Sequence, residues 1–262
     1  MPVALTIAGS DPSGGAGIQA DLKTFHQFGV YGEAVITLLT VQNTRRAGRV
    51  EVLPAGLVME QLEAVLEDIP PAAAKTGALG SAEIVRALAR AATGFRFPLV
   101  VDPVLTGKQG QLLLDSAALG ALRDELLPRA ALITPNVPEA EALSGEAIRG
   151  PEDLRRAAEI LRGMGAQAVL IKGGHLEGEA TDVVDVLLDG GEWHEFRATR
   201  LQTRHTHGTG CTYSAAITAG LACGHTLPAA VARANRFVHE AIRTAPGLGG
   251  GSGPVNHHAA VS

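Results

Sequence analysis

The chain has 262 residues, of which 46% are hydrophobic, 19% are charged and only 3% are aromatic, and its formal net charge is −5. This length and composition suit one large α/β domain, or two small ones, with a sizeable aliphatic core. No basic run is interleaved with aromatic residues, which argues against nucleic acid as the main partner. No apolar run approaches the roughly 20 residues that cross a bilayer, so we expect no membrane-spanning segment.

The N-terminus leads directly into an expected strand. Met1–Ile7 has no basic region ahead of its apolar residues, so it is not typical of a secretory signal. Cys211 and Cys223 fall on one expected helix, too far apart along it to reach each other. We expect both to be free thiols in a reducing cytoplasm.

A glycine-rich loop follows the first expected strand, at 3–8. It leads into a helix expected from about Gly15 to Phe28, whose start matches the G-x-G-x-x-A pattern of dinucleotide-binding folds. We reject that interpretation, because the loop is too long for a tight strand-to-helix turn. The next expected strand also ends on the amides Gln42 and Asn43, without the acidic residue that would bind a ribose hydroxyl.

Asp21 and Gln42 are the first candidate ligand residues along the chain. Asp21 lies about one helical turn beyond the loop and could point into it, or it could be a solvated carboxylate on the helix face. Gln42 ends an almost wholly apolar strand, where parallel sheets bind ligands. Its amide offers an acceptor beside donors, which suits a ring with an amino group next to a ring nitrogen, as in an aminopyrimidine. A solvated strand end is the alternative.

Strands and helices alternate through the rest of the chain with short connections. Apolar periodicity predicts strands at 34–43, 50–53, 72–76, 98–102, 131–134 and 168–172, a hairpin at 182–198, and helices at 54–68, 81–92, 116–127, 136–144, 151–164 and 227–244. This alternation predicts one domain over 1–262, with a three-layer αβα fold and a mostly parallel central sheet. The segment 103–110 is a candidate lid, and the glycine-rich tail from Gly247 is expected to be loosely ordered at first.

Polar residues follow several of these buried strands. Asp102 ends the strand at 98–102, and Asn136 and Glu139 follow the strand at 131–134. Oxygen ligands of this kind suit Mg²⁺, which keeps several waters and takes further ligands from phosphates. The alternative is a capping box between Asn136 and Glu139. Lys172, before two glycines, could reach a phosphate or could be a surface lysine in a turn.

The segment around Gly208, Thr209, Gly210 and Cys211 is the candidate anion site. Its glycines allow successive backbone N–H groups to point the same way. A helix expected from near Cys211 to about Cys223 adds unpaired N–H groups and the positive end of its dipole. The segment therefore suits a multiply charged anion, although an ordinary glycine-containing helix entry is the alternative. At such a helix start we expect the Cys211 thiolate to be favoured and reactive.

These motifs occur together in the order of one known family. The matching segments are 6–23, 42–44, 75–77, 102–104, 134–140, 172–175 and 206–212, and they span nearly the whole chain. The chain resembles the ribokinase-like small-molecule kinases, and within them the hydroxymethylpyrimidine/phosphomethylpyrimidine kinases of thiamin biosynthesis. Many ribokinase-like enzymes have an aspartate at the position of Cys211, and the cysteine is typical of the pyrimidine branch.

The resemblance implies an ATP-dependent phosphotransferase that uses Mg²⁺. It would phosphorylate 4-amino-5-hydroxymethyl-2-methylpyrimidine on its alcohol and then phosphorylate the resulting monophosphate. The implied substrate-binding residues are Gly9, Asp21, Thr40 and Gln42; the implied phosphate, ATP and metal residues are Asp102, Asn136, Glu139 and Lys172; and the implied catalytic residues are Gly208, Thr209, Gly210 and Cys211. Cys211 is the candidate base for the alcohol.

The resemblance also implies a cytoplasmic homodimer. Two alternatives stay open. A pyridoxal or pyridoxine kinase could use the same site, although a pyridine ring lacks the amino group beside a ring nitrogen that suits Gln42. A catalytically silent protein that binds pyrimidines or nucleotides is the other alternative, against which the intact Cys211, Asn136, Glu139 and Lys172 argue.

Overall fold

The central sheet organises the molecule, whose computed structural model describes residues 1–107, 110–111, 113–175 and 181–261. Within these residues, nine strands pair in the order β3-β2-β1-β4-β5-β6-β7-β8-β9. Their bounds are β1 Val3–Ser10, β2 Tyr31–Gln42, β3 Ala47–Val52, β4 Ala73–Thr76, β5 Leu99–Val101, β6 Leu132–Ile133, β7 Ala168–Ile171, β8 Asp182–Asp189 and β9 Glu192–Thr199.

Six neighbouring strands run parallel to one another, and these are β2, β1, β4, β5, β6 and β7. The antiparallel strands β3, β8 and β9 lie toward the two edges of the sheet. The short apolar strands β4 to β7 are buried along their whole length, as expected for parallel strands covered on both faces. The predicted mostly parallel sheet is confirmed. Because the parallel strands share one direction, their C-terminal ends meet at one edge of the sheet.

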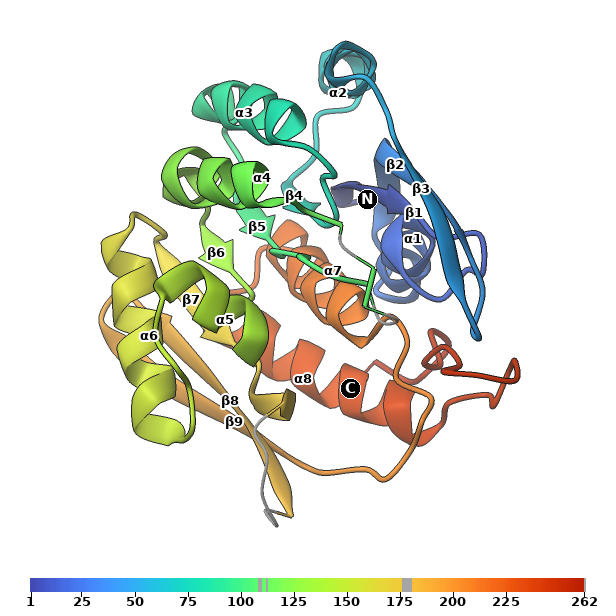
Figure 1. The fold of residues 1–262 in the computed structure, drawn as a ribbon, viewed down its shortest axis with the longest axis vertical. Helices are drawn as coiled ribbons and strands as arrows, with labels where there is room; N and C mark the ends of the chain where they lie inside the picture. Colours follow the sequence, from blue (N-terminus) through green and yellow to red (C-terminus); the bar gives the residue numbers. More distant parts are fainter. Residues whose placement is uncertain (108–109, 112, 176–180, 262) are drawn as a thin grey trace.

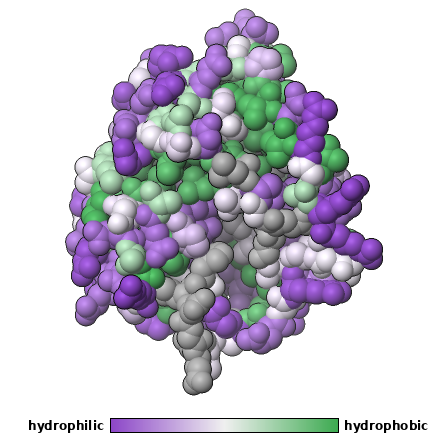
Figure 2. All heavy atoms as spheres, viewed as in Figure 1, coloured by the Kyte–Doolittle hydropathy of each residue, from purple (hydrophilic) through white to green (hydrophobic). Residues whose placement is uncertain are grey.

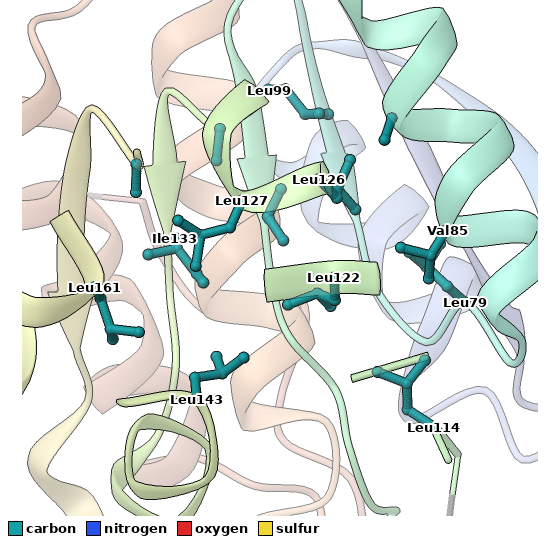
Figure 3. Close-up of a cluster of buried hydrophobic side chains, with 14 of the residues drawn as sticks. Leu79, Val85, Leu99, Leu114, Leu122, Leu126, Leu127, Ile133, Leu143 and Leu161 are labelled. Atoms are coloured by element: carbon teal, nitrogen blue, oxygen red, sulfur yellow. The ribbon is translucent and has the colours of Figure 1, made fainter. Parts of the chain in front are cut away.

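Helices cover both faces of the sheet (Figure 1). Their bounds are α1 Gly17–Gln27, α2 Ala55–Asp68, α3 Ala82–Ala91, α4 Ser116–Ala121, α5 Val137–Ser144, α6 Pro151–Gly163, α7 Thr209–Ala222 and α8 Leu227–Arg243. Helices α1, α7 and α8 contribute to one buried hydrophobic cluster, and α2 to α6 contribute to a second one. Figure 3 shows the second cluster, in which the labelled side chains are leucine, isoleucine and valine. The predicted αβα layers and aliphatic core are confirmed.

Hydrophilic and hydrophobic side chains occupy different parts of the molecular surface. Figure 2 shows hydrophilic residues around most of the rim of this face and a hydrophobic area in its upper half. Among the described residues, no helix is both long and apolar enough to cross a bilayer.

Three local predictions need correction. The helix expected at 116–127 ends as α4 at Ala121 and continues as a π-helical turn, Leu122–Leu126. Helix α7 begins at Thr209, two residues earlier than expected. The first part of the tail is not loosely ordered, because the N–H of Ser252 donates to the carbonyl of Thr44 at 2.9 Å; further on, Val255 is 2% exposed and its N–H donates to the carbonyl of His207 at 3.3 Å. Part of the candidate lid, at 108–109, lies outside the described residues.

Candidate active site

A cavity of about 790 Å³ opens at the C-terminal ends of the parallel strands, where such sheets bind ligands. The predicted site residues that line it are Gly9, Thr40, Gln42, Asp102, Asn136, Glu139, Lys172, Gly208, Thr209, Gly210 and Cys211. The structure therefore brings together eleven of the twelve predicted positions, although they come from segments spread over most of the chain. Asp21 is the exception among them.

The candidate anion site lies at the start of α7. Gly208 has φ +81° and is the residue before the first helical position, and no side chain caps the first turn. A Cβ at Gly208 would lie only 1.7 Å from the carbonyl oxygen of Gly15, so only glycine fits where the two loops meet. The N–H of Thr209 donates to the carbonyl of Thr206 at 3.3 Å, but the uncapped first turn leaves the N–H groups of Gly210 and Cys211 available for a ligand anion.

Lys172 and Asp102 form a partly buried ion pair beside this turn. The Lys172 Nζ lies 2.9 Å from Asp102 Oδ1, and a Cβ at Gly210 would lie 3.5 Å from the same nitrogen. The hydroxyls of Thr134 and Ser214 also donate to Asp102, at 3.0 and 3.2 Å. Burial alone would lower the pKa of Lys172, but Asp102 and Glu139 raise it above its usual value. Lys172 is therefore a mostly buried ammonium group that faces the anion site, with 13% of its side chain exposed, and not a surface lysine.

For Asn136 and Glu139 the structure confirms the capping box, whereas their role as ligands stays a prediction. Asn136 Oδ1 accepts from the Glu139 N–H at 2.9 Å, and Glu139 Oε2 accepts from the Asn136 N–H at 2.8 Å, so the capping box is present. Both residues nevertheless line the cavity. Burial raises the pKa of Glu139 to about 7, with a further contribution from Asp102 that Lys172 opposes. A cation that binds beside Glu139 would favour its ionised form.

The structure corrects the expected contact between Asp21 and the substrate. The Asp21 carboxylate is fully buried and does not line the cavity. It accepts from Lys75 Nζ at 2.8 Å and from Thr6 Oγ1 at 2.6 Å. Asp21 points from α1 into the protein toward β4 and β1, because these strands supply its two donors.

Removing the positive charge of Lys75, which is paired with the buried Asp21 carboxylate, should destabilise the fold strongly. For Lys75→Met we expect the free energy of unfolding to fall by about 3–5 kcal/mol, because a buried carboxylate is left without its partner. The double variant Asp21→Asn with Lys75→Met should recover most of this loss, since no unpaired charge remains. Urea unfolding followed by circular dichroism measures both values. Equal losses in the single and double variants would contradict the ion-pair explanation.

Cys211 also differs from its prediction. Both cysteines are free, as expected, but burial, opposed by Lys75 and reinforced by Asp21 and Asp102, raises the pKa of the Cys211 thiol to about 11 in total. The predicted preference for the thiolate is therefore wrong, because burial outweighs the position at the helix start. Cys211 is a thiol in the free protein at neutral pH.

Three residues at the site were missed or left unassigned in the sequence. Asp11 pairs with His207, whose Nε2 lies 2.8 Å from Asp11 Oδ2. Gln111 Nε2 donates to Gln42 Oε1 at 3.1 Å. The Asp-Pro-Ser sequence beginning at Asp11 is typical of a side-chain-stabilised turn, and Asp11 and His207 also lie in the matching segments 6–23 and 206–212. No sequence pattern pairs residues as distant as Gln42 and Gln111.

Comparisons with known proteins agree with this geometry. The model of the phosphomethylpyrimidine kinase family matches residues 11–256. The chain is 48% identical over 256 residues to the hydroxymethylpyrimidine/phosphomethylpyrimidine kinase of Streptomyces coelicolor, covering 98% of this chain and 94% of the relative. It is 50% identical over 254 residues to the thiamine biosynthesis bifunctional protein ThiED of Geobacter sulfurreducens, covering 97% of this chain but only 51% of that longer protein.

Solved structures share the fold closely. The pyridoxal kinase from Staphylococcus aureus in complex with pyridoxal superposes with a TM-score of 0.90 at 38% identity, covering 99% of this chain and 94% of that chain. The phosphomethylpyrimidine kinase from Clostridium difficile 630 superposes with a TM-score of 0.82 at 43% identity, covering 92% of this chain and all of that chain (100%). The family match over nearly the whole chain and the full-length relatives show that this chain belongs to the phosphomethylpyrimidine kinase family.

Proposed function

We propose that the chain transfers the γ-phosphoryl group of ATP to the alcohol of 4-amino-5-hydroxymethyl-2-methylpyrimidine, and then transfers a second one to the monophosphate. The observation that carries this proposal is the position of Gln42 and the Gly208–Cys211 turn in one cavity. An amide that suits an aminopyrimidine and a turn that suits a phosphate are thus present together. The full-length relatives named hydroxymethylpyrimidine/phosphomethylpyrimidine kinase support the same activity.

The pyrimidine side of the cavity is formed by the ends of β1 and β2. Thr40 Oγ1 donates to the carbonyl of Ser10 at 3.1 Å, which ties the two strand ends together. A Cβ at Gly9 would lie 2.5 Å from Leu38 Cδ1, so glycine makes room for the Leu38 side chain in this wall of the cavity. In this proposal Gln42 reads the amino group and the adjacent ring nitrogen, and Gly9 and Thr40 shape the surrounding wall.

The phosphate side would act mainly by position and charge, because phosphoryl transfer needs orientation and stabilisation of spread negative charge. The N–H groups at the start of α7 would donate to the transferred group, and the Lys172 ammonium would offset its charge. As the alcohol oxygen bonds to the γ-phosphorus, the bond to ADP breaks and the alcohol loses its proton. In this proposal the Cys211 sulfur takes that proton, which requires the thiolate form.

The residues at this edge fit Mg²⁺. Among the described residues, no group of three or more His, Cys, Asp or Glu side chains could enclose a metal by itself. One or two carboxylates with phosphates and waters are the usual ligands of Mg²⁺, and Glu139 would be the main protein ligand because Asp102 is already paired with the Lys172 ammonium. When bound, Mg²⁺ would neutralise charge on the phosphates.

Pyridoxal kinase activity is the alternative that a specific observation favours. The backbone superposes more closely on a pyridoxal kinase, whereas sequence identity is higher to a phosphomethylpyrimidine kinase. We give identity more weight, because the TM-score reports the backbone and substrate choice depends on side chains. The Gln42 amide also favours the pyrimidine substrate, since a pyridine ring lacks the amino group beside a ring nitrogen that suits this amide.

Incubation with ATP, Mg²⁺ and hydroxymethylpyrimidine, followed by mass detection, tests the proposal. We expect the monophosphate to appear first and the diphosphate later, and pyridoxal to react more slowly at equal ATP. Faster reaction of pyridoxal would favour the alternative kinase. ATP consumption that does not rise with either alcohol would favour a silent binding protein.

The homodimer stays a proposal. Exposed apolar residues on β2, β3 and α2 offer a surface for it, and these are Tyr31, Leu39, Val41, Val52 and Leu57.

A further inference from the structure

The tail that follows α8, drawn in dark red in Figure 1, folds back onto the protein and contacts the residue before Gly208. The N–H of His207 donates to the carbonyl of Gly253 at 3.0 Å, and the N–H of Val255 donates to the carbonyl of His207 at 3.3 Å. Pro254 therefore lies beside His207 as in a parallel bridge between two strands. Both backbone hydrogen-bonding groups of His207 are thus bonded to the tail.

A second contact of the tail lies just beyond Cys211. Thr212 Oγ1 is 3.2 Å from His257 Nε2, and both side chains are buried. Burial is the main reason that the pKa of His257 falls to about 4, with smaller contributions from Lys23, His258 and His207. The His257 imidazole is therefore neutral at pH 7, and a neutral imidazole has one nitrogen that can accept from a hydroxyl.

These two contacts lie on either side of the Gly208–Cys211 turn. His207 is the residue before the turn and Thr212 is the residue after it, and the Thr212 N–H donates to the carbonyl of Gly208 at 2.9 Å. No side chain caps the start of α7. The direction of the free N–H groups in the turn is therefore set by the backbone on its two sides, and the tail contacts both sides.

The tail can hold the turn because it is itself attached to α8 and α1. The N–H of Asn256 donates to the carbonyl of Ala241 at 2.9 Å, and Asn256 Nδ2 donates to Thr244 Oγ1 at 3.0 Å. Gln27 Nε2, at the end of α1, donates to the carbonyl of Ala259 at 2.8 Å. Val255 and Ala259 also belong to the buried cluster to which α1, α7 and α8 contribute. The tail thus links the start of α7 to two helices of the same layer.

We propose that the tail segment 253–257 is a positioning element of the active site, which holds the N–H groups of the Gly208–Cys211 turn in the direction that the transferred phosphoryl group requires. This inference rests on the proposed function, in which that turn binds the phosphoryl group. Donors of this kind act because they are preorganised at the place where charge develops, and a misplacement of about 1 Å can lower a rate by about 10²-fold. The tail contacts no reacting atom and acts through His207 and Thr212.

His257→Leu is the first test, because it removes the nitrogen that faces Thr212. We expect kcat per folded protein to fall by about 10-fold or more in both phosphorylation steps. KM for hydroxymethylpyrimidine should stay unchanged, since the turn acts on the transition state and not on the ring. His257→Gln places an amide near the position of Nε2 and should restore most of kcat. A contact that only stabilises the fold would lower the folded fraction without this separation of kcat from KM.

Asn256→Ala is the matched control. It removes contacts of the tail to Thr244 and to the N–H of His258, but none to the turn, so it should lower the urea midpoint and keep the wild-type kcat. Wild-type kcat in His257→Leu would overturn the inference. Equal losses of kcat in Asn256→Ala and His257→Leu at similar urea midpoints would overturn it as well.

Gly253→Ala decides the matter if His257→Leu does not fold. Its Cβ would lie 2.4 Å from His205 Nδ1 and 2.5 Å from the carbonyl oxygen of Leu248, so the Gly253 carbonyl must move away from the His207 N–H. We expect the same fall in kcat at constant KM. Wild-type kcat in folded Gly253→Ala would overturn the inference when this variant alone can be measured.

Hydrogen exchange of peptides that cover residues 206–213, measured by mass spectrometry, separates this inference from the proposed function. The N–H groups of His207 and Thr212 are hydrogen-bonded, and we expect His257→Leu to exchange them faster than the wild type does. Faster exchange with wild-type kcat would mean that the turn does not bind the phosphoryl group, and the proposed phosphate contact would fail together with the inference. Wild-type exchange with wild-type kcat would refute the role of the tail alone and leave the proposed function standing.

Discussion

Replacing Cys211 with alanine should slow the first phosphorylation by about 10²–10⁴-fold, the usual contribution of a general base. The first acceptor is an alcohol, which must lose its proton as it attacks phosphorus. The second acceptor is a phosphate that is already anionic, so Cys211→Ala should slow the second step much less. Single-turnover rates with the alcohol and with the monophosphate, each measured by mass detection of product, give the two effects separately.

The pH dependence provides a second test of the same role. Burial raises the pKa of Cys211 to about 11, so the thiol predominates at pH 7 and the thiolate fraction grows as pH rises. If the thiolate is the base, kcat/KM for the alcohol should rise about tenfold per pH unit between pH 7 and pH 9. The monophosphate should show no comparable rise. Cys223→Ser, at an exposed position, controls for effects of thiol loss in general.

Two results would contradict a base role. Equal losses in both steps for Cys211→Ala would indicate that the side chain only positions the acceptor. A profile for the alcohol that is flat up to pH 9 would show that the first step does not need the thiolate. Either result would leave the anion site and the Gln42 contact unaffected.

The sequence predicted the sheet and its reactive edge well because both depend on local patterns. Apolar runs closed by Asp102, Asn136 or Lys172 indicate buried parallel strands with polar C-terminal ends. Parallel strands must then bring those ends to one edge, whatever the details of packing. For this reason the cavity gathers nearly all of the predicted residues.

The errors arise where tertiary contacts decide. Asp21 has a helical position that allows it to face the loop, but the sequence does not show that Lys75, on a distant strand, takes its carboxylate. Cys211 stands at a helix start, which favours a thiolate, yet the depth of burial that opposes it is a property of the assembled protein. The tail contains many glycines, and only the structure shows that the segment around Val255 pairs with His207.

Gly208→Ala should abolish both phosphorylation steps, with a loss in kcat of at least about 10³-fold. The new Cβ would lie 1.7 Å from the carbonyl oxygen of Gly15, so the start of α7 must move away from the 11–17 loop, and the backbone donors would no longer point at the transferred phosphoryl group. The loss of one such donor alone typically costs about 10²–10³ in kcat, and this displacement affects several.

Gly224→Ala is the matched control for that loss. Gly224 also has φ +81°, but a Cβ there would meet nothing within 4 Å. Alanine therefore imposes the same backbone strain, about 1–2 kcal/mol, without the collision. We expect Gly224→Ala to lower the urea midpoint and to keep nearly full kcat, whereas Gly208→Ala loses both steps even in the fraction that remains folded. Wild-type turnover by folded Gly208→Ala would mean that the start of α7 does not bind the phosphoryl group, because the collision with the Gly15 carbonyl displaces its donors.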